Sequence, residues 1–193
     1  MSAAPPVSAT RRHLVSLLVE NRAGVLARIA GLFSRRGFNI FSLAVAPSED
    51  ERFSRVSMVV DLESAGLEQV VAQLDKLVNV VAIGELRPED AHEAELLLAT
   101  LAVAPHERAP LLEALSAEGG RVLDERGDAL TVQLAARPAA LDAFEALARR
   151  SRIIELQRTG TIGLPKLSAA QPSPRESVSD ADPFAIPARL EQH

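Results

Sequence analysis

Residues 14–43 read LVSLLVENRAGVLARIAGLFSRRGFNIFSL, and this stretch holds the features that decide the fold. The run at 13–20 is nearly all apolar and is followed by turn residues, which is typical of a β-strand covered on both faces. Apolar residues then recur at helical spacing from Val25 to Phe33, with arginines elsewhere on the wheel. This spacing predicts an amphipathic helix that ends at Gly37.

The chain beyond this helix completes an order of elements that defines a fold class. The polar turn at 47–51 indicates a hairpin between two neighbouring strands. The predicted elements are a strand at 38–46, a strand at 53–62, a helix whose apolar stripe runs from Leu67 to Val78, and a strand at 80–86. The order β-α-β-β-α-β is that of the ferredoxin-like fold, with both helices on one face of an antiparallel sheet.

The second half of the chain repeats this order less regularly. Its predicted elements are a strand at 96–103, a helix at 108–118, hairpin strands at 121–126 and 129–135, a helix at 138–149 and a strand at 152–158. We therefore predict an α+β protein with two tandem ferredoxin-like domains. The predicted boundaries are a flexible tail at 1–11, a first domain at 12–87, a second domain at 93–166 and a disordered, Pro- and Ser-rich tail at 167–193.

The composition excludes several classes of partner. A net charge of -5 with only 3% aromatic residues disfavours a nucleic acid or an anionic membrane as the partner. The first ten residues lack the charged and apolar regions of a signal peptide, and no apolar run reaches the roughly 20 residues of a membrane helix. Cysteine is absent, which rules out disulfides and suits the cytoplasm, where we expect the chain to reside.

No set of side chains in the sequence suggests catalysis. The four histidines lie in unrelated contexts without metal-ligand spacing and are interpreted as surface residues: His13, His92, His106 and His193. The acidic turn at 49–51 is interpreted as solvated, and neither a phosphate-binding loop nor a dinucleotide-binding glycine pattern occurs. We predict a chain without catalytic residues, metal or cofactor.

One short constellation could bind a ligand. The loop at 21–24, Asn-Arg-Ala-Gly, precedes the first predicted helix, so amides from Gly24 to Leu26 can point at an anion such as a carboxylate. Asn39 lies at the start of the next strand, where its amide can both donate to and accept from a free amino acid. The alternative is that the loop only makes a turn and that Asn39 satisfies local backbone.

The sequence resembles the small subunits of acetolactate synthase. The resemblance is carried by the whole of 14–43, by SRVSM at 54–58 and by QLDKLVNV at 73–80. It continues more weakly through LTVQL at 130–134 to TGTIGL at 159–164, and so covers nearly all of residues 12–164. The first block is long enough to separate this family from other proteins that contain an ACT domain.

The resemblance implies a homodimer with an N-terminal ACT domain, a smaller C-terminal ferredoxin-like domain and no cofactor of its own. The expected partner is the large, catalytic subunit, which carries thiamine diphosphate, magnesium and FAD. The small subunit is expected to activate that partner and to confer feedback inhibition by valine, or by leucine or isoleucine. The family's effector-binding positions correspond to Asn21, Gly24, Val25 and Leu26, with Asn39 and Ile40 contributed by the other protomer.

The sequence departs from the family pattern at three places. Phe41 stands where the family usually has Glu, Thr100 where it usually has Lys, and Pro165-Lys166 where Ser-Arg is common. Coupling to the large subunit or the choice of effector can differ at these positions. Two other interpretations remain open from sequence: a stand-alone double-ACT sensor that acts on a protein such as a transcription regulator, and an enzyme with an unrecognised site.

Overall fold

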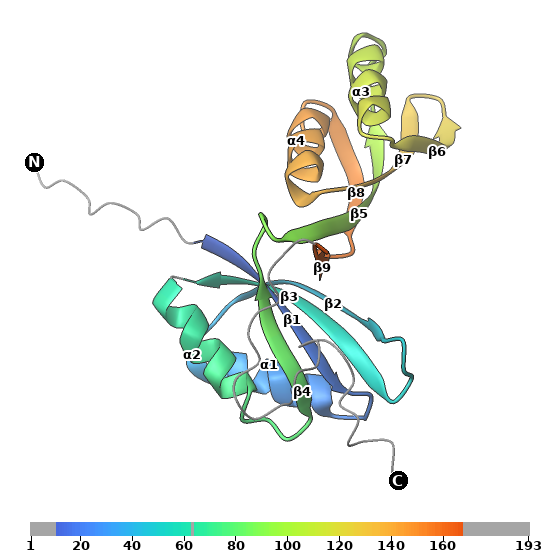
Figure 1. Cartoon of the computed structure of the whole chain (residues 1–193). Coiled ribbons are helices and arrows are strands. Elements are labelled where there is room, and N and C mark those ends of the chain that lie inside the picture. The colour runs from blue at the N-terminus through green and yellow to red at the C-terminus, as the bar shows by residue number, and fades with distance from the viewer. Residues whose placement is uncertain (1–10, 63, 168–193) are drawn as a thin grey trace, which may run out of the picture. The chain divides into compact units, whose positions relative to one another are not determined.

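The chain forms two compact units in the computed structural model, which describes residues 11–62 and 64–167 (Figure 1). Of the described residues, 11–62, 64–91 and 165–167 belong to the first unit, and His92–Leu164 form the second. Each unit has a β-α-β-β-α-β core, so the predicted α+β class with tandem ferredoxin-like domains is confirmed. The tails predicted at 1–11 and 167–193 lie almost entirely outside the described residues, and the domain boundaries stay predictions.

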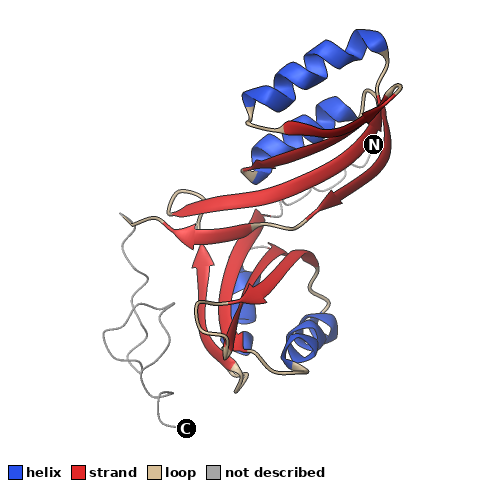
Figure 2. Ribbon diagram, turned by 90° about the vertical axis from the view of Figure 1, so that its right-hand side faces the viewer, coloured by secondary structure: helices blue, strands red, loops and turns tan. Residues whose placement is uncertain are grey.

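The first unit is an antiparallel sheet with two helices on one face, as Figures 1 and 2 show. The strand order is β2-β3-β1-β4, which leaves β2 at one edge. Its elements are β1 (Arg11–Glu20), α1 (Val25–Arg36), β2 (Ile40–Pro47), β3 (Phe53–Leu62), α2 (Ser64–Leu74) and β4 (Val80–Leu86).

Burial of β1 on both faces follows from its continuous apolar sequence. Val15, Leu17 and Val19 pack with residues of α1 and α2 in the main core. On the opposite face, Leu14 joins a smaller buried cluster, and Leu18 is fully buried. The prediction of a strand covered on both sides is therefore confirmed.

The second unit repeats the architecture with one added strand. The strand order is β6-β7-β5-β8, and β9 also pairs with β5. Its elements are β5 (Ala91–Ala102), α3 (Pro105–Ala117), β6 (Arg121–Arg126), β7 (Ala129–Ala136), α4 (Pro138–Ala148), β8 (Arg152–Arg158) and β9 (Ile162–Pro165). Leucines dominate a core between the sheet and the two helices, among them Leu97, Leu101, Leu130 and Leu141.

Several features of the observed elements differ from the predictions. The second helix ends at Leu74, and Val78 is 93% exposed, because the chain must turn before Val80 to pair with β1. Helix α3 begins at Pro105, where a missing amide proton costs nothing at a first helical turn. Strand β9 was not predicted, because a four-residue strand is defined by its pairing with the distant β5 rather than by a local pattern.

His13 is not a surface residue, contrary to the prediction. Its side chain is only 10% exposed, and Nδ1 lies 2.7 Å from a carboxylate oxygen of Glu85 on the neighbouring strand. His92 and His106 are exposed as predicted, and His193 lies outside the described residues. Within 11–62 and 64–167, no group of His, Asp and Glu side chains is arranged to hold a metal ion. No helix in the same ranges is long and apolar enough to cross a membrane.

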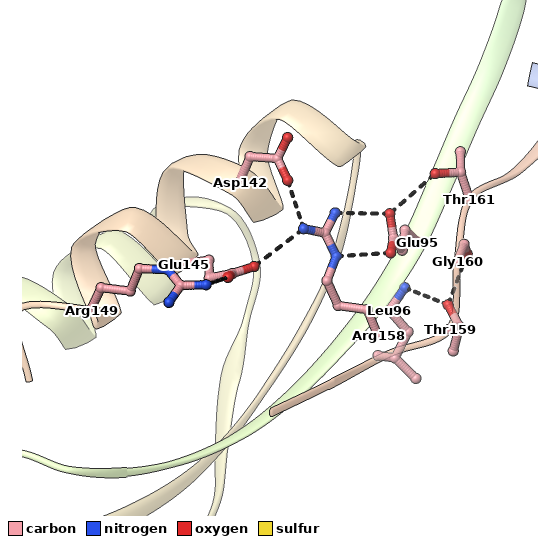
Figure 3. A network of polar contacts seen from close by, with 9 residues as sticks. All are labelled: Glu95, Leu96, Asp142, Glu145, Arg149, Arg158, Thr159, Gly160 and Thr161. Carbon is pink, nitrogen blue, oxygen red and sulfur yellow. Dashed lines mark hydrogen bonds and ion pairs between the residues drawn. The ribbon is translucent and has the colours of Figure 1, made fainter. Parts of the chain in front are cut away.

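A polar network holds the second unit together beside α4 (Figure 3). Arg158 on β8 donates two hydrogen bonds, of 2.8 and 2.9 Å, to the buried carboxylate of Glu95 on β5. The same guanidinium lies 2.6 Å from Asp142 and 3.4 Å from Glu145 on α4, and Thr161 donates to Glu95. The hydrogen-bonded Glu95 raises the pKa of Arg158, against the opposing effect of burial.

Candidate functional site

The loop at 21–24 is fastened to the turn that precedes β3. The backbone amide of Asn21 donates to the carbonyl of Arg52 at 2.7 Å, and its side-chain Nδ2 donates to the carbonyl of Glu51 at 2.9 Å. The side chain of Asn21 therefore bonds to the backbone of a turn 30 positions away in sequence. The same two bonds fix where the chain enters α1. They do not occupy the amides at the start of the helix, which can still bind a ligand.

Gly24 forms the start of α1 and leaves it uncapped. It has φ of 86°, in the left-handed region, and a Cβ built there would meet no atom within 4 Å. The first helical backbone bond runs from Arg28 N–H to the Gly24 carbonyl, so the amides of Leu26 and Ala27 have no acceptor within the helix. No acidic residue lies in the first turn. This open helix end can accept a carboxylate.

The side chains of the predicted site divide into core and surface groups. Val25 is buried and packs in the main core, so only its backbone can face a ligand. Leu26 is 42% exposed at the same helix end and offers an apolar contact beside the free amides. A carboxylate on the amides and an aliphatic group on Leu26 together match the two ends of a small aliphatic amino acid.

Asn39 and Ile40 lie at the other end of α1. The helix has 12 residues and is therefore about 18 Å long, which separates these two residues from Gly24 within one chain. Asn39 is exposed, and its side chain has no hydrogen-bond partner among the described residues. Ile40 is half-buried against the core. One chain alone thus carries two halves of the predicted site at opposite ends of its sheet.

Three residues that sequence analysis did not single out lie beside this loop: Glu20, Arg28 and Asn79. Nδ2 of Asn79 donates to Oε2 of Glu20 at 2.6 Å, and Nη1 of Arg28 donates to Oδ1 of Asn79 at 2.5 Å. The backbone amide of Glu20 also donates to the Asn79 carbonyl at 3.0 Å. These partners are separated by 51 and 59 positions in sequence, so no local pattern could reveal them. The only signal was the position of Asn79 inside the block QLDKLVNV.

Comparison with known proteins agrees with this architecture. Residues 15–82 match the family model described as the AHAS small subunit-like ACT domain, and residues 94–167 match the model of the small subunit of acetolactate synthase. The acetolactate synthase small subunit of Mycolicibacterium smegmatis is 37% identical over 155 residues, which are 80% of this chain and 91% of that protein. The chain belongs to the acetolactate synthase small-subunit family.

Other family members support the same assignment. The small subunit of acetolactate synthase isozyme 3 from Escherichia coli K12 is 38% identical over 79% of this chain and 94% of its own length. The crystal structure of the small subunit from Thermotoga maritima superposes with a TM-score of 0.74 at 30% identity, covering 82% of this chain and 99% of that chain. This chain is thus a small, regulatory and non-catalytic subunit whose first unit is an ACT domain.

The positions that depart from the acetolactate synthase small-subunit pattern have defined surroundings. Phe41 is 48% exposed, and the guanidinium of Arg12 lies 3.7 Å above its ring centre. Thr100 shares a 3.1 Å hydrogen bond with Thr131 across β5 and β7. Lys166 donates from Nζ to the carbonyl of Glu89 at 2.7 Å. Each departure is thus accommodated within its own unit.

Proposed function

We propose that this chain binds and activates the thiamine-diphosphate catalytic subunit of acetolactate synthase and makes it sensitive to a branched-chain amino acid, preferentially valine. The effector binds where two ACT domains meet in a homodimer. The observation that carries the proposal is the uncapped start of α1, where free amides lie beside the exposed Leu26. The enzyme's cofactors reside on the catalytic partner.

The edge strand β2 supports a site shared between two protomers. A two-fold axis that pairs two β2 edges aligns them antiparallel, so the start of one strand lies beside the end of the other. Pro47 ends β2 opposite Ser54, close to the turn whose Glu51 carbonyl holds Asn21. This pairing would bring the partner's exposed Asn39 amide toward the loop that precedes α1. The two halves of the predicted site, separate in one chain, would then complete each other.

Reconstitution tests the proposal. We expect the purified chain to lack acetolactate synthase activity alone, to raise the activity of the purified catalytic subunit, and to render that activity sensitive to valine. Leucine and isoleucine, assayed in parallel, define the effector preference. A chain that binds an amino acid but neither associates with nor activates the catalytic subunit would instead indicate a stand-alone sensor. Turnover of pyruvate by the isolated chain would contradict the proposal.

Replacing Asn39 by Ala should weaken binding of the effector without unfolding the chain. The side chain is exposed and unpaired among the described residues, so its removal costs little stability. A hydrogen bond to a charged ligand group is worth about 1.5–3 kcal/mol, which corresponds to at least about tenfold in affinity. The measurement is a valine titration of the reconstituted enzyme, with thermal unfolding of the variant as control. An unchanged inhibition midpoint would remove Asn39 from the site.

A further inference from the structure

Asn79 joins the two ends of the loop that precedes α1. Glu20 is the last residue of β1 and Arg28 lies in the first turn of α1, and the Asn79 side chain contacts both. Asn79 itself immediately precedes β4, and its carbonyl accepts the Glu20 amide at 3.0 Å. The three contacts, here called the Asn79 bridge, therefore connect β1, α1 and β4 around the loop.

The chemistry of the bridge requires an amide at this position. One atom of Asn79 must donate to a carboxylate and another must accept from a guanidinium, and an uncharged amide does both at once. Both bonds involve an ionised group, which makes them stronger than bonds between neutral groups. The Glu20 side chain is 27% exposed and Asn79 is half-buried, so solvent competes only in part with the bond between them. The bond from the exposed Arg28 to Asn79 is open to solvent.

The bridge determines where the free helix amides point. Asn21 holds the loop to the turn before β3, whereas the bridge holds the start of α1 to β1 and β4. A loop fixed on both sides keeps its geometry without a ligand, so binding does not have to supply the ordering cost. We propose that Asn79 is a positioning residue for the amino-acid effector, holding the amides of α1 in place without touching the ligand. This inference rests on the proposed function.

A reversal of hydrogen-bond polarity tests the bridge. Asn79→Asp replaces the 2.6 Å hydrogen bond from Nδ2 of Asn79 to Glu20 by two carboxylates that repel each other. This variant should lose the contact between positions 79 and 20. Adding Glu20→Gln supplies an amide that donates to the new carboxylate, which still accepts from Arg28, so the double variant should restore it. Glu20→Gln alone is the matched control, because the side-chain oxygen of Gln still accepts the hydrogen bond from Nδ2 of Asn79.

Calorimetry of L-valine binding to the full chain gives the first measurement. We expect the Kd to rise roughly tenfold for Asn79→Asp and to return to within about threefold of the original in the double variant and in the control. The thermal midpoint should change little, because the bridge lies outside the two buried cores. Equal valine affinity for Asn79→Asp and the original chain, or a folded double variant with no recovery, would overturn the inference.

Amide hydrogen exchange without effector separates this inference from the proposed function. Exchange across residues 21–28 should be faster in Asn79→Asp and normal in the double variant, because only the bridge has changed. Unchanged exchange in Asn79→Asp would show that the bridge does not position the loop. Failure of the original chain to bind valine, leucine or isoleucine, with exchange altered as expected, would instead overturn the proposed effector site.

Discussion

Replacing Gly24 by Asp should raise the valine concentration that half-inhibits the reconstituted enzyme by roughly thirtyfold. The carboxylate of an Asp at this position would lie next to the effector carboxylate that the α1 amides are proposed to bind. Two like charges about 4 Å apart repel by about 4 kcal/mol at an effective dielectric constant of 20, and we take about half because the position is exposed. About 2 kcal/mol corresponds to a factor near thirty in affinity.

Gly24→Asn is the matched control for this prediction. Both substitutions place a side chain of the same shape at φ 86°, where residues other than glycine are strained, and Asn tolerates this region as well as Asp does. The space that the Cβ of either side chain would occupy is open, with no other atom within 4 Å. The difference between the two inhibition midpoints therefore reports the charge alone. Equal midpoints for both variants would contradict a carboxylate site at this helix start.

Replacing Arg158 by Met should destabilise the second unit by about 3 kcal/mol. The substitution leaves the Glu95 carboxylate, which is 5% exposed, without its cation and without two hydrogen bonds. We take the lower end of the range for breaking a buried ion pair, because Arg158 is itself 19% exposed. Chemical denaturation of the full chain, followed by hydrogen exchange across β5 and β8, measures the loss where it is expected.

Two further variants separate the buried charge from lost packing. Arg149→Met removes an arginine that is 68% exposed and paired with Glu145 one helical turn away, and it should cost less than about 0.5 kcal/mol. Glu95→Gln in the Arg158→Met background removes the unpaired charge and should recover about 1–2 kcal/mol. No recovery would mean that Arg158 acts through packing of its aliphatic portion rather than through Glu95.

Local patterns in the sequence were sufficient to predict most of the fold. The limits of β3 and β4 were predicted to the residue, because their apolar runs are bounded by turns. Helix α1 was predicted equally well, because Gly24 and Gly37 mark its two ends. The start of β5 was missed, since Ala91–Glu95 read as polar and the partners of the buried Glu95, Arg158 and Thr161, are distant in sequence.

The candidate site was predictable only where it lies within one short segment. The loop at 21–24 and the start of α1 follow from turn and helix signals that span a few residues. Asn79 reaches Glu20 and Arg28 across more than fifty positions, so its role needed the folded chain. Asn39 was predicted from its amide and its place at a strand start, but its contribution from the other protomer came only from the resemblance. Its distance from Gly24 within one chain is explained by the proposed dimer.

The hydrogen bonds of Lys166 make the second unit an insertion in the topological sense. Its amide donates to the carbonyl of Asp90 at 2.8 Å, so the chain leaves the first unit and rejoins it at the same place. An inserted domain whose ends meet can be exchanged or removed without redirecting the host chain.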